Sequence, residues 1–210
     1  MNRIVFLLEE RSMKVLLDGL LPRLYPDLAF HCVPHEGKQD LEKSVPRKLR
    51  AWREPGVRFV VLRDNDGEDC RSVKRALAKL CVESGRADTL VRIACQELEA
   101  WYLGDPEALA EAFGNPRLAA IASRARFRDP DTVVHPSFEV EQLVPAFQKV
   151  SGARCMASAL ARERNGSRSF QVLFEGLDRI VGDMRRAPKS EARGCWHCAT
   201  RNASERRWTC

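Results

Sequence analysis

The stretch "VVLRDNDGEDC", from Val60 to Cys70, changes from an apolar run to a cluster of acids within a few residues. The apolar run is typical of a strand buried in a protein core. Asp64 and Asp66 stand one residue apart where the run ends, and Glu68 and Asp69 follow at once. Carboxylates this close together repel one another. The stretch therefore indicates either a turn in which water screens the charges or a site where a cation binds.

Similar apolar runs recur along the first half of the chain and alternate with segments of helical periodicity. Strands that alternate with helices indicate an α/β domain with a mainly parallel sheet, here of about four strands flanked by helices. Ser12 is a candidate N-cap of the first helix, because serine hydroxyls accept hydrogen bonds from backbone N–H groups. The predicted strands are Arg3–Glu10, Leu28–Pro34, Val57–Arg63 and Thr89–Gln96, and the predicted helices between them are Ser12–Leu24, Asp40–Trp52 and Asp69–Glu83.

The carboxyl ends of parallel strands meet at one edge of a sheet, and functional groups collect there. The second predicted strand is followed by "HEGK", which contains Lys38. The other three end in acidic pairs, namely Glu9 with Glu10, Asp64 with Asp66, and Glu97 with Glu99. Magnesium prefers oxygen ligands, and a bound Mg²⁺ or Mn²⁺ clamps phosphate oxygens and activates water. The pattern therefore favours a divalent-metal site at this edge.

The second half of the chain has helical periodicity from about Leu103 to Val181, interrupted by five prolines. Its last part, "KVSGARCMASALARERNGSRSFQVLFEGLDRIV", is typical of two helices joined by a turn at "RNGSRS". We predict an α/β core over residues 1–104, a helical C-terminal part of the same domain over residues 105–184, and a basic, disordered tail over residues 185–210.

The positive charge of the chain is concentrated in this tail. The formal net charge is +6, and residues 185–210 contain seven Lys/Arg and two Asp/Glu, a net charge of +5. The rest of the chain carries 28 basic and 27 acidic residues. An almost neutral body gives little support to a nucleic-acid partner on charge alone.

The sequence also bears on location and redox state. No stretch approaches the roughly 18 consecutive apolar residues of a membrane helix. Acids follow the short N-terminal apolar run where a cleavage site would stand. We therefore expect a cytoplasmic protein without a membrane partner, and eight cysteines present as reduced thiols. "CWHC" at Cys195–Cys198 offers too few nearby ligands for a structural zinc site.

A glutamate after an N-terminal apolar strand, followed later by Asp-x-Asp after another strand, resembles the Toprim domain of topoisomerases, bacterial primases and overcoming-lysogenization-defect nucleases. Five blocks resemble more closely a bacterial Toprim-like family catalogued as domain of unknown function 4276, in order from about Met1 to Val181. These blocks are "FLLEERSMKVLLDGLLPRL", "HEGKQDLEKSVPRKLRAW", "VVLRDNDGEDC", "RIACQELEAWYLGDPEAL" and "NGSRSFQVLFEGL".

The resemblance implies a Toprim fold and assigns roles to particular residues. It implies that Glu9, Asp64 and Asp66 are the catalytic residues. It also implies that Asp64 and Asp66 bind the metal, and that Glu9 acts as general acid or base or completes the metal site. Glu97 and Glu99 lie in the "ELEAW" block, where either one is a further metal ligand or both favour the positive end of a helix dipole. Toprim domains usually carry glycine after the glutamate, and here Glu10 replaces it, which puts the approach of a substrate in doubt.

Three further residues have two interpretations each. Lys38 is either a phosphate ligand or a solvated loop lysine. Ser167 and Ser169 belong to the block "SRSF", where they contact phosphate or serve the start of a helix, with Ser167 as its N-cap.

The residues and the resemblance together predict a divalent-metal-dependent phosphoesterase, a Toprim-type nuclease acting on DNA or RNA. Members of the family resemble nucleases and often neighbour ATPases in mobile or defence loci, so the resemblance implies phage defence with an ATPase partner. Two alternatives stay open. The first is a catalytically degenerate module that docks on an ATPase and binds nucleic acid or nucleotide, and the second is a metal-dependent enzyme acting on small phosphorylated molecules.

Overall fold

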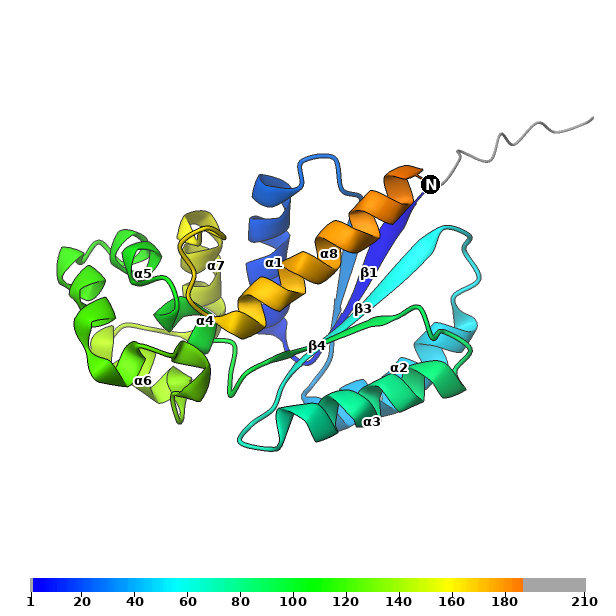
Figure 1. Ribbon diagram of the computed structural model, residues 1–210, viewed down its shortest axis with the longest axis horizontal. Helices are drawn as coiled ribbons and strands as arrows, with labels where there is room; N and C mark the ends of the chain where they lie inside the picture. Colours follow the sequence, from blue (N-terminus) through cyan, green and yellow to red (C-terminus); the bar gives the residue numbers. More distant parts are fainter. Residues whose placement is uncertain (1, 187–210) are drawn as a thin grey trace, which may run out of the picture.

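A computed structural model describes residues 2–186, and the predicted tail from residue 187 onward lies outside the described residues. The centre of the fold is a four-stranded, all-parallel sheet with the strand order β2-β1-β3-β4 (Figure 1). The predicted fold class, an α/β fold with a mainly parallel sheet of four strands, is confirmed. The strands are β1 (Arg3–Leu8), β2 (Phe30–Pro34), β3 (Val57–Asp64) and β4 (Leu90–Ala94).

The strand register brings the strand ends to a common edge. β1 lies between β2 and β3, and its last residue, Leu8, pairs with Pro34 on one side and Leu62 on the other. On the far side of β3, Asp64 pairs with Ala94 at the end of β4. The residues after β1 and β4 therefore flank the end of β3, which is where the acidic residues of the sequence gather.

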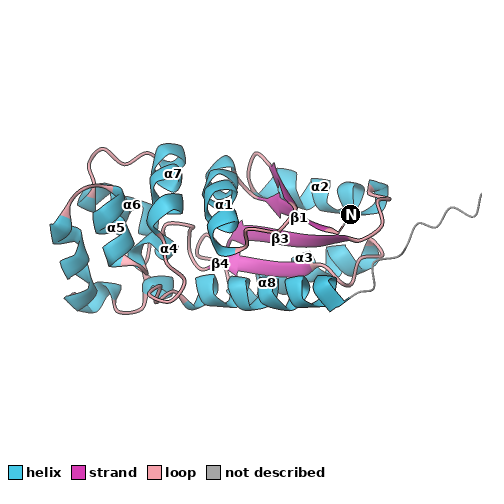
Figure 2. Cartoon of the chain, turned by 90° about the horizontal axis from the view of Figure 1, so that it is seen from above, coloured by secondary structure: helices cyan, strands magenta, loops and turns pink. Residues whose placement is uncertain are grey.

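Alternation along the central strands separates two layers of helices. Ile4, Phe6 and Leu8 of β1 belong to one buried cluster together with residues of α1 and α8, whereas Val5 and Leu7 join a second cluster with residues of α2 and α3. Accordingly, α1 and α8 cover one face of the sheet and α2 and α3 cover the other (Figures 1 and 2). These helices are α1 (Arg11–Leu24), α2 (Lys38–Ala51), α3 (Cys70–Glu83) and α8 (Arg168–Arg186).

The last of these helices approaches the sheet closely. Gly176 of α8 faces Leu90 of β4, and a Cβ atom at this glycine would stand 2.8 Å from the Leu90 side chain. Arg92 of β4 donates a hydrogen bond from Nε to the carbonyl of Val172, 2.9 Å away. α8, from the second half of the chain, therefore completes the helix layer that α1 begins on this face of the sheet.

Short helices fill the chain between β4 and α8 and lie beyond the carboxyl edge of the sheet (Figures 1 and 2). Four prolines start helices there, consistent with the preference of proline for the first helical turn. The α-helices are α4 (Ala100–Leu103), α5 (Pro106–Ala112), α6 (Pro136–Leu143) and α7 (Lys149–Ala159), and the 3₁₀ helices are η1 (Pro116–Ser123), η2 (Ala125–Phe127) and η3 (Pro130–Thr132).

The prediction that Ser12 caps the first helix is wrong. α1 begins at Arg11, so Ser12 lies inside the helix and Glu10 occupies the N-cap position. The Ser12 hydroxyl donates a hydrogen bond to the Glu10 carboxylate instead.

β1, β2 and β4 are shorter than predicted, whereas β3 extends one residue further, to Asp64. Glu9 and Glu10 after β1, and Cys95 and Gln96 after β4, already belong to the connecting loops. None of the helices within residues 2–186 has the length and apolar character needed to cross a bilayer.

Candidate metal centre

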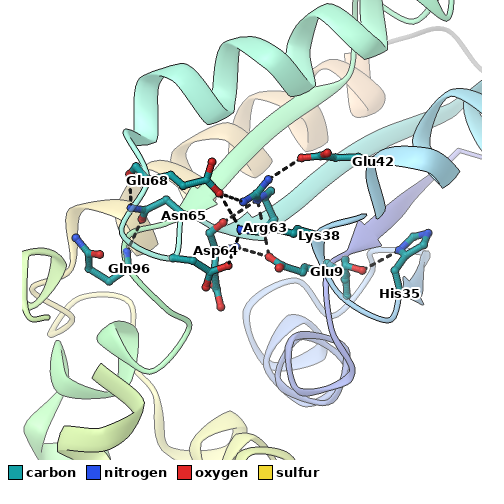
Figure 3. A network of polar contacts seen from close by, with 11 residues as sticks. Glu9, His35, Lys38, Glu42, Arg63, Asp64, Asn65, Glu68 and Gln96 are labelled. Atoms are coloured by element: carbon teal, nitrogen blue, oxygen red, sulfur yellow. Dashed lines mark hydrogen bonds and ion pairs between the residues drawn. The ribbon is translucent and has the colours of Figure 1, made fainter. Parts of the chain in front are cut away.

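Glu9 follows β1 directly and points along the carboxyl edge toward β3. Its Oε2 atom accepts a hydrogen bond from the backbone N–H of Asp64, at 2.8 Å, and the side chain is almost fully buried (Figure 3). Burial raises the pKa of the Glu9 carboxyl, and the hydrogen bond from Asp64 opposes part of this rise. Glu9 is therefore held in a fixed orientation beside the end of β3.

Asp64 is the last residue of β3 and lies at the centre of the acidic edge. Its side chain is buried, and its Oδ1 atom has no hydrogen-bond partner. Burial raises the pKa of this carboxyl well above its usual range, and the nearby Glu99 and Glu9 raise it further. An unpartnered carboxylate in such a place is unfavourable unless a cation or a proton neutralises it.

Glu99, at the N-terminus of α4, brings a third buried carboxyl to Asp64. It is fully buried, and neither of its oxygens has a hydrogen-bond partner. Burial raises the pKa of Glu99 to about 7, although the positive charge of Lys149 lowers it in part. Glu97 is used differently, because its Oε2 atom accepts a hydrogen bond from the backbone N–H of Ser137, 2.6 Å away, at the start of α6. The two glutamates of the "ELEAW" block therefore have separate environments.

Asp66 lies on the exposed rim of the site, in a loop with an unusual backbone. Asp66 and Gln96 both have left-handed conformations, with φ values of 46° and 63°, which non-glycine residues rarely adopt. The N–H of Asp66 donates to the carbonyl of Gln96 at 3.1 Å, and the N–H of Gln96 donates to the side chain of Asn65. Strained residues of this kind concentrate at functional sites. The loops after β3 and β4 thus hold each other beside the carboxylates.

A buried arginine that the sequence analysis did not single out organises the other side of the edge. Arg63 is 2% exposed at its side chain, and its guanidinium lies between Glu42, at 2.8 Å, and Glu68, at 3.0 Å (Figure 3). It also approaches Oε2 of Glu9 to 4.0 Å and donates to the carbonyl of Asp64 at 2.8 Å. The signal in the sequence was a charged residue directly before Asp64, at the end of the apolar run of residues 59–62.

Two more residues that the sequence analysis did not single out approach these carboxyls, namely Tyr102 on α4 and Lys149 at the start of α7. Burial opposes the positive charge of Lys149, but the attraction of Glu99, Glu10 and Asp64 outweighs this effect and raises its pKa. Its Nζ atom lies 3.9 Å from the Glu10 carboxylate. The hydroxyl of Tyr102 is buried without a hydrogen-bond partner, and burial followed by the charge of Glu99 raises its pKa. No local sequence pattern marks either residue.

The residues at this edge fit a partly hydrated divalent cation. Three buried carboxylate oxygens have no protein partner, one on Asp64 and two on Glu99. Within residues 2–186, no three His, Cys, Asp or Glu side chains stand close enough to enclose an ion by themselves. Magnesium usually keeps several waters and needs only one or two protein carboxylates. The donor set therefore suits Mg²⁺ with water completing its coordination.

The other predicted site residues lie at the border of this edge or behind it. Lys38, the first residue of α2, is half-exposed and its Nζ atom lies 3.1 Å from Glu68 and 3.9 Å from Asp66. Ser167 is fully buried, and its hydroxyl accepts from the backbone N–H of Phe170, at 3.1 Å, as an N-cap of α8 does. Lys38 therefore joins the carboxylate network, whereas Ser167 supports a helix end.

An aspartate occupies the place where the two serines would meet an anion. Asp131 accepts hydrogen bonds from the hydroxyl of Ser167 at 2.6 Å and from the backbone N–H of Ser169 at 2.7 Å. The hydroxyl of Ser169 also donates to Asp131, at 3.0 Å, and accepts from the backbone N–H of Cys95. The Asp131 carboxylate thus takes up hydrogen bonds that a phosphate would need at this helix terminus.

Comparisons with known structures agree with this architecture. The chain is similar to the C-terminal region of the Burkholderia pseudomallei OLD protein, with a TM-score of 0.53 and 14% sequence identity, over 86% of this chain and 99% of that one. It is also similar to the C-terminal region of the Xanthomonas campestris pv. campestris OLD protein, with a TM-score of 0.51 and 14% identity, over 88% and 98% of the two chains. Because the sequence identity is only 14%, these comparisons show a similar fold and do not assign a function.

Sequence comparison identifies the family. A search of curated proteins gives no match. The profile of the family described as "Domain of unknown function (DUF4276)" matches residues 8–178, a range that contains every residue of the carboxylate edge. The resemblance that the sequence motifs indicated is thereby confirmed, and the chain belongs to the DUF4276 family.

Proposed function

We propose that the protein is a divalent-metal-dependent phosphoesterase, a Toprim-type nuclease that cleaves DNA or RNA. The observation that carries this proposal is the set of three unpartnered carboxylate oxygens on Asp64 and Glu99, buried at the carboxyl edge of a parallel sheet. Buried charges without partners destabilise a fold, and a bound cation removes this cost. The likeness of the fold to OLD protein regions, within the nuclease-related group to which the motifs pointed, supports the same reaction class.

The proposed metal ligands are Asp64 and Glu99, and Asp66 adds negative charge from the exposed rim. Mg²⁺ or Mn²⁺ bound there supplies electrostatic stabilisation of phosphate oxygens and a more acidic water molecule. Lys149 faces the same carboxylates and limits the negative charge that an incoming phosphate meets. Glu97 is not part of this set, because its carboxylate is engaged at the start of α6.

Glu9 is the proposed general acid or base. The hydrogen bond from the Asp64 N–H and the approach of Arg63 fix the position of its carboxylate. Burial raises its pKa toward the pH at which proton exchange is most effective for catalysis. A carboxyl group that is both fixed and raised in pKa suits proton transfer to or from a reacting oxygen.

The proposed context is phage defence in the cytoplasm together with an ATPase partner. The similar solved chains are C-terminal regions of larger OLD proteins, and the present chain covers nearly their whole length. A region that forms part of a longer protein elsewhere is a natural candidate for assembly with a separate partner. Lys38 is proposed as a contact for substrate phosphate, because it stands half-exposed at the border of the carboxylate edge.

The experiment that tests this function is a cleavage assay with purified full-length protein. Labelled single-stranded DNA, duplex DNA and RNA are incubated with Mg²⁺ or Mn²⁺, with and without a candidate ATPase. We expect metal-dependent cleavage that Asp64→Asn lowers by about 100-fold or more, because this substitution removes a charged ligand from the metal site. Glu141→Gln is the matched control, because Glu141 is an exposed carboxylate of α6 outside the site.

Other results identify the alternatives. Nucleic-acid binding without cleavage, in wild-type protein with the ATPase present, contradicts the nuclease and identifies a docking module. Hydrolysis of small phosphate esters without cleavage of polynucleotides identifies an enzyme for small substrates. Equal activity of the wild-type and Asp64→Asn proteins places the reaction elsewhere in the molecule.

A further inference from the structure

Two cysteine thiols meet beside the carboxylate edge. Cys70 is the first residue of α3, and Cys95 directly follows β4. Their Sγ atoms lie 3.4 Å apart, and both side chains are partly exposed. A disulfide bond has a sulfur–sulfur distance of about 2.0 Å, so the two sulfurs need to approach by only about 1.4 Å. Small side-chain rotations provide a movement of this size.

The surroundings of the pair favour reaction over simple packing. Cys32 and Cys81 are fully buried, as cysteines that act as small apolar residues commonly are. Cys70 and Cys95 are accessible, and within residues 2–186 they form the single pair of cysteine sulfurs within hydrogen-bonding distance.

We propose that Cys70 and Cys95 form a redox-active pair that hydrogen peroxide converts into an intramolecular disulfide. The Cys70 thiolate attacks the peroxide oxygen, the O–O bond breaks, and Cys70 becomes a sulfenic acid while water leaves after protonation. The Cys95 sulfur then attacks the Cys70 sulfur, the S–O bond breaks, and a second water leaves with the Cys95 proton. The two thiols lose two electrons in total, which reduce the peroxide, and a reducing thiol reverses the reaction.

The bond would join the two loops that carry the acidic site. The loop after β3 and the loop after β4 already contact each other through Asp66, Asn65 and Gln96. Cys95 also donates its backbone N–H to Ser169 at the start of α8. A disulfide between Cys70 and Cys95 would therefore link the end of β4 covalently to the start of α3. This modification does not depend on the proposed catalytic activity.

Peptide mapping tests the proposal directly. Reduced full-length protein is treated with hydrogen peroxide, the remaining thiols are alkylated, and the protein is digested with trypsin. Cleavage after Arg63, Arg71, Arg92 and Arg117 places Cys70 and Cys95 in separate peptides, each with no other cysteine. We expect the linked peptide pair to appear in monomeric protein and to disappear on reduction. The linked protein should melt roughly 5–10 °C higher, because the bond restricts the unfolded chain.

Single variants supply the controls. Cys70→Ser and Cys95→Ser should each abolish the linked pair and the shift in melting temperature, whereas Cys155→Ser, at a partly exposed cysteine of α7, should retain both. Independent alkylation of both cysteines, at peroxide concentrations that already oxidise Cys155, would show that the contact is packing alone. Linkage confined to covalent dimers would equally overturn the proposal.

Discussion

Glu99 illustrates how a single buried carboxyl couples the site to pH. Burial raises the pKa of Glu99 in the folded protein to about 7, above the value near 4.5 that applies to an exposed glutamate. A raised pKa means that the folded state holds its proton at pH values where the unfolded chain has lost it. The contribution to stability is therefore fully present below about pH 4.5 and is lost as the pH rises through 7.

Glu99→Gln should remove this dependence. In metal-free buffer, the wild-type protein should lose about 3 kcal/mol of unfolding free energy through Glu99 between pH 4.5 and 7.5, since each unit of pKa shift corresponds to about 1.4 kcal/mol. The amide cannot ionise, so the variant should not lose this stability. Relative to the wild type, its unfolding free energy should therefore rise by about 3 kcal/mol between pH 4.5 and 7.5. Urea unfolding at several pH values measures both curves.

Glu141→Gln serves as the exposed control and should follow the wild-type curve. Parallel pH profiles for wild type and Glu99→Gln would show that Glu99 is already neutralised by a partner in the protein. The metal proposal would then lose two of its three unpartnered oxygens.

The sequence indicated part of the site through local signals. Glu9, Asp64 and Glu99 follow three different apolar runs, and parallel pairing of these runs is sufficient to bring their side chains to one edge. Lys149 and Tyr102 had no such signal, because they reach the site through the packing of helices whose positions depend on tertiary contacts. The roles of all five residues stay predictions.

At the scale of elements, the carboxylate of Asp131 lies at the N-terminal end of α8. Asp131 accepts hydrogen bonds from the backbone N–H of Ser169 and from the hydroxyls of Ser167 and Ser169. A carboxylate at the positive end of a helix is favourable, because the free N–H groups and the helix dipole attract negative charge. The arrangement ties the 3₁₀ segment η3 to α8 and, through Ser169, to the end of β4.

Asp131→Ala should open an anion site at this helix end. We expect a loss of about 2–3 kcal/mol of unfolding free energy, because partly buried donors lose a charged acceptor. Inorganic phosphate should restore part of this stability by binding in place of the carboxylate. Thermal unfolding with phosphate, compared with sodium chloride at equal ionic strength, measures the recovery.

The wild-type protein and Asp131→Asn, which keeps an acceptor oxygen, are the controls for this experiment. Neither should gain stability from phosphate beyond the effect of ionic strength. Equal phosphate stabilisation of wild type would instead indicate that Ser167 and Ser169 contact phosphate while Asp131 is present, as one interpretation of the "SRSF" block predicts.

The whole molecule should respond to Mg²⁺ as a ligand of its folded state. Crowded carboxylates destabilise the metal-free fold, and an ion that binds only the folded state adds stability by mass action. We expect an increase of roughly 1–3 kcal/mol at Mg²⁺ concentrations well above the dissociation constant. Differential scanning calorimetry with Mg²⁺ against sodium chloride at matched ionic strength measures this increase.

The variant Asp64→Asn should fold and lose most of the Mg²⁺ response, because its amide fills the same volume without the charge. Glu141→Gln should keep the full response, since Glu141 is an exposed residue of α6 and none of the proposed metal ligands. A Mg²⁺ effect of equal size in all three proteins would mean that the ion acts by general screening.

The fold class could be predicted from the sequence because apolar runs and helical periodicity are visible within short segments. Runs such as "RIVFLL" are buried on both sides, and they alternate with amphipathic helices, which is sufficient to specify a parallel sheet. The ends of the strands were harder to predict. The predicted strands continued to Glu10 and Gln96, but the chain has already left the sheet at Leu8 and Ala94. Where a strand ends depends on its neighbours, which a single run does not report.

The closing of the sheet by α8 has a consequence for synthesis on the ribosome. β1 and α1 emerge first, but the apolar cluster that they begin includes Phe170, Phe174 and Leu177 of α8. A nascent chain that has not yet produced Arg168–Arg186 leaves the face beside Leu90 uncovered. This layer therefore completes only after α8 has been synthesised, and a ribosome stalled before α8 presents an apolar surface to chaperones and proteases.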